Sequence, residues 1–139
     1  MRTTTTLLVT TAMLTFARGV VASDDYRCTI ERVVTPTHDS DSVQKMLTAQ
    51  YVSKSFTVER RTGLMAGALK NSFEKPPLVV DQGSKANSYK VIATLKVGEP
   101  GVVGSSVKVL VVNEFSAGAK KPFLYLDLDV VYSGTCEHY

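Results

Sequence analysis

The stretch YRCTIE, residues 26–31, decides the fold, because its apolar and polar residues alternate with a period of two. Alternation of this kind indicates a strand with one buried face, and it places Tyr26, Cys28 and Ile30 together on that face. Pro36 ends the run. The sequence therefore opens its folded part with a half-buried strand that carries a cysteine on its inner side.

Cys136 is the one other cysteine in the chain, and it lies on the last predicted strand. Two cysteines in an exported protein usually pair, and neither belongs to a C-x-x-C motif or to a cluster of metal ligands. We therefore predict a disulfide between Cys28 and Cys136, which would bring the first and last strands within about 6 Å. A sheet joined in this way closes into a barrel or a sandwich.

Residues 1–22 have the organisation of an export signal. Arg2 gives a positive start, the uncharged stretch Leu7–Ala17 has the length of a signal core, and Val20–Ala22 offers small residues for cleavage. The uncharged stretch is shorter than the roughly 20 residues that a spanning helix needs. The sequence predicts a signal peptide over residues 1–22, a mature domain over 23–139 with no membrane span, and a secreted or periplasmic location.

The predicted mature domain has the size of one ordinary domain, since removal of residues 1–22 from 139 leaves 117. The whole chain has 16 basic and 13 acidic residues, a formal charge of +3, and loss of Arg2 and Arg18 with the signal would leave +1. A near-neutral domain lacks the basic surface that nucleic acids require. We expect one domain and no nucleic-acid partner.

Two local patterns follow the first strand. Val43, Met46, Leu47 and Tyr51 recur at helical spacing after a Ser/Asp-rich stretch, which predicts a short helix near residues 42–52. Residues 55–69 (SFTVERRTGLMAGAL) then alternate, turn at an Arg-Thr-Gly sequence and return, which predicts a β-hairpin.

The remaining chain predicts further short strands near residues 78–80, 89–97, 107–112, 122–126 and 130–136. Pro76-Pro77 restricts the first of these to a sheet edge or to a short piece of strand. The run Val107–Val112 is apolar on both faces, so we expect it to be central or covered by the helix. The predicted fold is mainly β: a single antiparallel meander of seven or eight strands closing into a small barrel or sandwich, with one short helix.

Few residues offer chemistry. Asp127 and Asp129 could both face a Ca²⁺ ion, but that ion takes six to eight oxygens, so the polar turn is the preferred interpretation. His38 lies in a polar loop without a nucleophile motif nearby, and the chain has no phosphate-binding, dinucleotide-binding or H-E-x-x-H motif. We therefore assign no catalytic residue, metal or cofactor, and no motif supports an enzymatic activity.

The polar stretch Asp81–Tyr89 predicts a presented loop, with Gly83, Ser84, Asn87 and Tyr89 as candidate binding residues. Together with Tyr26-Arg27-Cys28 and Cys136, its Gly83-Ser84 and Tyr89 resemble the small periplasmic inhibitors of c-type lysozyme, which are disulfide-closed barrels. This chain lacks the tryptophan that usually follows the loop in that family, so no inhibitory residue is carried over. The presented loop predicts a non-catalytic, protein-binding module, and the resemblance implies that it is inhibitor-like.

A carrier of a small apolar ligand is the alternative. Its cavity would be lined by Tyr89, Val91, Val109 and Phe123. The same side chains could simply fill the core of a domain of this size. An open interior would favour the carrier, and a filled one would favour an unknown protein partner bound at the surface.

Overall fold

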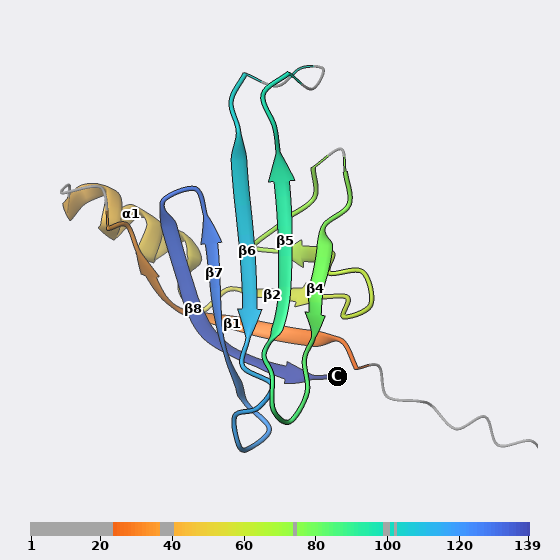
Figure 1. Ribbon diagram of the computed structural model, residues 1–139. Helices are drawn as coiled ribbons and strands as arrows, with labels where there is room; N and C mark the ends of the chain where they lie inside the picture. The colour runs from red at the N-terminus through yellow and green to blue at the C-terminus, as the bar shows by residue number, and fades with distance from the viewer. Residues whose placement is uncertain (1–23, 37–40, 74, 99–100, 102) are drawn as a thin grey trace, which may run out of the picture.

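The computed structural model describes residues 24–36, 41–73, 75–98, 101 and 103–139, and within them it has eight strands and one helix (Figure 1). The bounds are β1 (Tyr26–Val34), α1 (Asp41–Tyr51), β2 (Ser55–Val58), β3 (Met65–Gly67), β4 (Leu78–Gln82), β5 (Tyr89–Leu95), β6 (Ser106–Val112), β7 (Lys121–Asp127) and β8 (Val130–His138). Every strand pair is antiparallel. The mainly β prediction is confirmed, whereas the predicted signal peptide and His38 lie outside the described residues.

The strands form one curled sheet, a half-barrel, in the order β3-β2-β1-β8-β7-β6-β5-β4. Strands that follow each other along the chain are neighbours, except for β3 and β4, and β1 pairs with β8. In Figure 1 the strands β1 and β2 cross behind β5 and β6. The meander is therefore a half-barrel in which β3 and β4 are not paired with each other. The first and last strands, which were predicted to be joined, lie in the middle of the sheet, and β3 and β4 are its edge strands among the described residues.

The predicted disulfide is present between Cys28 and Cys136, whose Cα atoms are 3.9 Å apart. The two residues are direct partners in the register of β1 and β8. Both side chains are fully buried, so the covalent bond lies inside the curl of the sheet. It ties together two strands that are separated by 108 positions in the sequence.

The concave side of the sheet holds the core. Alternation along β1 buries Tyr26, Cys28 and Ile30, as predicted, and exposes the residues between them. The core contains large aromatic side chains that contact one another, including an edge-on pair of Phe56 and Phe123 with ring centroids 5.2 Å apart. Burial of this apolar area is the main stabilising contribution to a domain of this size.

The predicted helix is α1, and it packs on β1 rather than over β6. Leu47 and Tyr51 contact the core, while Met46, which shares their predicted apolar stripe, is 58% exposed. The Gln44 side chain bonds the β1 backbone, donating from Nε2 to the Val33 carbonyl at 2.6 Å. Of the two positions expected for β6, the structure has the central one, between β5 and β7.

The predicted hairpin is formed by β2 and β3. Its turn ends at Gly63, where φ is +75° and a Cβ atom would lie 2.7 Å from a methyl group of Val91. Both the backbone conformation and this close contact disfavour a side chain at position 63. Asn71 in the following connection is buried, and its amide bonds the Met65 N–H and the Gly63 carbonyl. The connection after β3 is thus fixed to the hairpin that precedes it.

Candidate functional site

The β4–β5 turn, residues 83–88, projects at the lower end of the half-barrel in Figure 1 and is closed by its own hydrogen bonds. The Gly83 amide donates to Oδ1 of Asp81 at 2.9 Å, and Gly83 has a φ of +71°. The amides of Ala86 and Asn87 both donate to Oγ of Ser84 at 3.1 Å. These bonds fix an exposed polar turn in one shape before any partner arrives.

Arg60, from the β2–β3 turn, supports the β4–β5 turn from the side. Its guanidinium donates to the Gln82 carbonyl from Nη2 at 2.7 Å and from Nε at 3.1 Å, and reaches the Gly83 carbonyl at 3.4 Å. The Tyr89 hydroxyl donates in turn to the Arg60 carbonyl at 2.9 Å. Arg60 therefore bridges the gap between the two edge strands of the sheet at this end.

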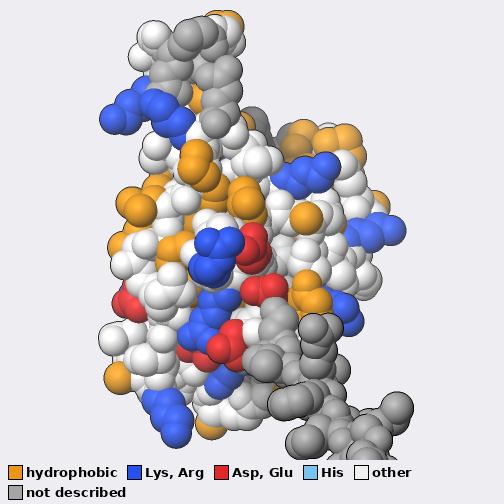
Figure 2. All heavy atoms as spheres, turned by 90° about the vertical axis from the view of Figure 1, so that its right-hand side faces the viewer, with side chains coloured by type: hydrophobic (Ala, Val, Ile, Leu, Met, Phe, Trp, Pro, Cys, Tyr) orange, Lys and Arg blue, Asp and Glu red, His pale blue; other side chains and the backbone are white. Residues whose placement is uncertain are grey.

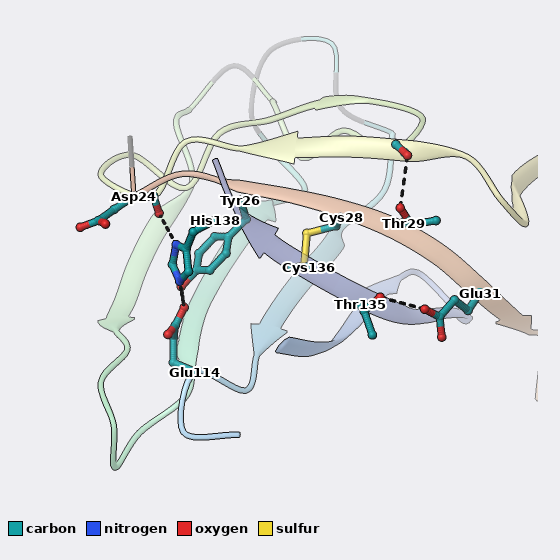
Figure 3. Close-up of a disulfide and its surroundings, with 10 residues drawn as sticks. Asp24, Tyr26, Cys28, Thr29, Glu31, Glu114, Thr135, Cys136 and His138 are labelled. Carbon is teal, nitrogen blue, oxygen red and sulfur yellow. Dashed lines mark hydrogen bonds and ion pairs between the residues drawn. A yellow bond between two sulfur atoms is a disulfide. The ribbon is translucent and has the colours of Figure 1, made fainter. Parts of the chain in front are cut away.

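Glu114, from the β6–β7 turn, supports the same end from beneath. Its Oε1 accepts a hydrogen bond from the Tyr26 hydroxyl at 2.5 Å and lies 2.7 Å from Nε2 of His138. Nδ1 of His138 lies 3.0 Å from the Asp24 carbonyl. Figure 3 shows the His138 ring between the Asp24 carbonyl and the Glu114 carboxylate, beside the Tyr26 ring. Both ends of the described chain meet at this carboxylate, and we call Tyr26, Glu114 and His138 the end cluster.

Burial and hydrogen bonding shift the acidities in and around the end cluster. Burial alone would raise the pKa of Glu114, but the bond from Tyr26 and the positive charges of His138 and Arg60 outweigh it and lower that pKa. Burial raises the pKa of Tyr26, and its bond to Glu114 raises it further. Burial likewise raises the pKa of Tyr89. The cluster thus holds an ionised Glu114 carboxylate against the neutral Tyr26 hydroxyl.

A shallow depression of about 500 Å³ lies beside the β4–β5 turn and is lined by Asp24, Asp25, Arg60, Arg61 and Gln82. Figure 2 shows acidic and basic side chains gathered on this side of the molecule, below a group of apolar ones. A depression with both signs of charge suits polar contacts with another surface and does not suit an apolar ligand.

The candidate cavity residues fall into two sets. Tyr89, Val91 and Phe123 are buried on the concave side and belong to the packed core. Val109 lies on the outer face instead, because Leu110 and Val112 occupy the inward positions of β6. The three fully buried tyrosines each use their hydroxyl groups on the protein itself: Tyr26 on Glu114, Tyr89 on Arg60, and Tyr125 on the Lys70 carbonyl at 2.9 Å. The interior is occupied by side chains.

An apolar row crosses the outer face of the sheet. Successive register partners from β4 to β8 are Leu78, Ile92, Val109, Leu126 and Val131. Exposed neighbours extend the row, including Val80 at 53%, Val107 at 48% and Leu124 at 45%. Apolar side chains grouped on a protein surface are typical of sites that contact another molecule.

The remaining candidates have structural surroundings. Asp127 ends β7 and pairs with Lys108 at 3.1 Å, and the turn predicted around it is present between β7 and β8. Among the described residues no group of three or more His, Cys, Asp or Glu could hold a metal ion. No helix in the described part of the chain is long and apolar enough to cross a membrane.

The end cluster does not follow from any local sequence pattern, because its members are up to 114 positions from the groups they bind. One signal was available, because the antiparallel pairing of Cys28 with Cys136 places Tyr26 opposite His138. No signal placed Glu114 there. Of the candidate binding residues, Gly83, Ser84 and Asn87 lie together in the turn, whereas Tyr89 is buried below it.

Comparison of the chain with protein-family models, curated proteins and solved structures finds no match.

Proposed function

We propose that this protein is a non-catalytic, inhibitor-like binding module that recognises a protein partner through the β4–β5 turn. The observation that carries the proposal is the internal bonding of the turn, in which Ser84 accepts two backbone N–H groups while its neighbours stay exposed. A turn fixed in this way loses little conformational entropy on binding, which favours affinity. Lys85 stands in the middle of this exposed segment and offers a cation to an acidic partner surface.

The core supports surface recognition over the alternative, a carrier of an apolar ligand. Tyr89, Val91 and Phe123, which were candidates for lining a cavity, pack into the core instead. The buried tyrosine hydroxyls bond groups of the protein itself, so a ligand entering between them would have to break those bonds. The apolar row on the outer face offers a second area for contact with a partner.

The proposed setting is secreted or periplasmic. A disulfide in the core supports an oxidising compartment, since such bonds are rare in the cytosol. Residues 1–22, with the organisation of a signal peptide, support export. A protein partner in the same compartment would meet the turn directly.

A c-type lysozyme is the probe that tests this proposal, because Gly83-Ser84 and Tyr89 in the sequence resemble the periplasmic inhibitors of that enzyme. The oxidised protein is titrated against the lysozyme, and lysis of a bacterial cell suspension is followed. We expect a saturating loss of lysozyme activity, and a weaker effect for Lys85→Glu in the turn. Lys45→Glu on α1 makes the same change of charge at an exposed site outside the turn and should inhibit like the wild type. An unchanged rate of lysis at a clear molar excess would end the inhibitor proposal.

A further inference from the structure

The His138 ring lies between two hydrogen-bond acceptors. Nδ1 meets the Asp24 carbonyl at 3.0 Å and Nε2 meets the Glu114 carboxylate at 2.7 Å. A carbonyl oxygen and an ionised carboxylate can only accept, so both contacts are hydrogen bonds only when both ring nitrogens carry a hydrogen. The ring that makes both bonds is therefore the positively charged imidazolium (Figure 3).

Several elements place charged or titratable groups around this ring. Glu114 comes from the β6–β7 turn, and Tyr26 from β1 lies with its ring centroid 4.7 Å from that of His138. Arg60 from the β2–β3 turn lies over the Tyr26 ring at 5.8 Å and is 3.8 Å from the Asp24 carboxylate. The other ionisable groups at this end are Asp25, which accepts the Arg60 N–H, Tyr89, Lys121, which donates to the Glu114 carbonyl, and the neighbours of His138 along β8, Glu137 and Tyr139.

Glu114 also contacts the β4–β5 turn. A Cβ atom placed on Gly83 would lie 2.8 Å from Cγ of Glu114, so the glutamate side chain lies directly against this glycine. The adjacent Asn113 accepts a hydrogen bond from Ser88 at 3.0 Å, at the other end of the same turn. The position of Glu114 is thus coupled by direct contact to the shape of the turn.

We propose that His138 is a protonation switch for the β4–β5 turn. The charged ring holds Glu114 beneath Gly83, and the turn keeps its closed shape. As the pH rises and the ring loses one proton, one of its two nitrogens becomes an acceptor facing an acceptor, and that bond is lost. The His138 ring then holds Glu114 less firmly, and the β4–β5 turn becomes more mobile. The structural coupling stands on its own, while its effect on a partner rests on the proposed function.

An NMR titration of the oxidised protein without any partner tests the coupling. The ring nitrogen signals of His138 and the backbone amide signals of Gly83 and Ser84 are followed as the pH is raised from acidic to alkaline values. We expect the ring to be doubly protonated on the acidic side and the two amides to shift with the same midpoint as the ring. In the His138→Gln variant this step should vanish from the amides, and in His38→Gln, which removes the other histidine, it should remain.

Glu114→Gln gives a second route if His138→Gln does not fold. It keeps the shape of Glu114 without its charge, and the amides should then no longer follow the His138 ring. Amide steps that persist unchanged in His138→Gln or Glu114→Gln, or a neutral His138 ring on the acidic side, would overturn the switch. Because no partner is present, this result is independent of lysozyme inhibition, which can fail while the coupling is seen.

Discussion

Cys28 on β1 and Cys136 on β8 are direct partners in the antiparallel register, and a disulfide joins them inside the half-barrel. The bond lies in the middle of the sheet, while β3 and β4 are its edge strands among the described residues. It therefore holds together the two halves of the meander, β1 to β3 and β4 to β8, that have no other covalent link besides the connection from β3 to β4.

Removal of the disulfide should cost much stability without changing the fold. For a loop of 108 residues the chain-entropy estimate is about 4–5 kcal/mol of unfolding free energy, less any strain in the native bond. Urea unfolding of Cys28→Ala/Cys136→Ala against the oxidised wild type measures the loss. Reduced wild-type protein serves as the control and should unfold with the double variant; equal stability of all three forms would contradict the structural role.

A side chain at position 134 should destabilise the join between β1 and β8. A Cβ atom on Gly134 would collide with the Thr29 carbonyl oxygen and come 2.9 Å from the Glu31 nitrogen, where β1 has a bulge. We expect Gly134→Ala to cost about 2 kcal/mol or more, because backbone atoms must move. Gly104→Ala, with no atom within 4 Å, should change the unfolding free energy by less than about 0.5 kcal/mol. Thermal unfolding compares the two.

Asn71 should contribute more to stability than any asparagine of the exposed turn. Its buried amide satisfies the Met65 N–H at 2.9 Å and the Gly63 carbonyl at 2.7 Å. Asn71→Ala leaves both groups unbonded, and we expect a loss of about 2–4 kcal/mol. Asn87→Ala, in the exposed β4–β5 turn, is the matched control and should stay within about 0.5 kcal/mol. Similar losses for both variants in urea unfolding would contradict this account.

Glu114 should make the protein more stable above the ordinary carboxyl pKa than below it. Its pKa is lowered in the folded state, so its contribution is present above the ordinary value of 4.5 and is lost as the pH falls through the folded-state pKa. Glu114→Gln should therefore be less stable than the wild type near neutral pH, and the difference should shrink in acid. Unfolding curves from about pH 3 to about pH 7 test this. Glu137→Gln removes an exposed pair with Lys120 and should run parallel to the wild type.

Local patterns predicted most of the strands. In an antiparallel sheet with one face in solvent, the alternation of apolar and polar residues along each strand shows which side chains are buried. The alternation of Tyr26, Cys28 and Ile30 and the turn at Gly63 needed no tertiary information. The same alternation failed for β6, where both faces are apolar and the period does not say which side is inward. That is why Val109 was expected in a cavity and lies on the outer face.

Two features depend on tertiary structure: the separation of β3 from β4 in the strand order, and the end cluster. The connection from β3 to β4 is anchored through Asn71 and through the Lys70 carbonyl, which Tyr125 and Lys108 bond, and no local pattern shows this. Glu114 reaches Tyr26 across 88 positions of sequence. Such contacts follow from the curl of the whole sheet, so the sequence could predict the presented turn but not what holds it in place.

In our proposal, a partner is recognised on the outside of the sheet because side chains occupy the interior. Native mass spectrometry of the oxidised protein, mixed with a long-chain fatty acid, tests it most directly. We expect to detect only the mass of the unliganded protein under conditions that preserve the fold. A saturable one-to-one complex that Tyr89→Trp abolishes, by filling space next to Tyr26, would contradict it.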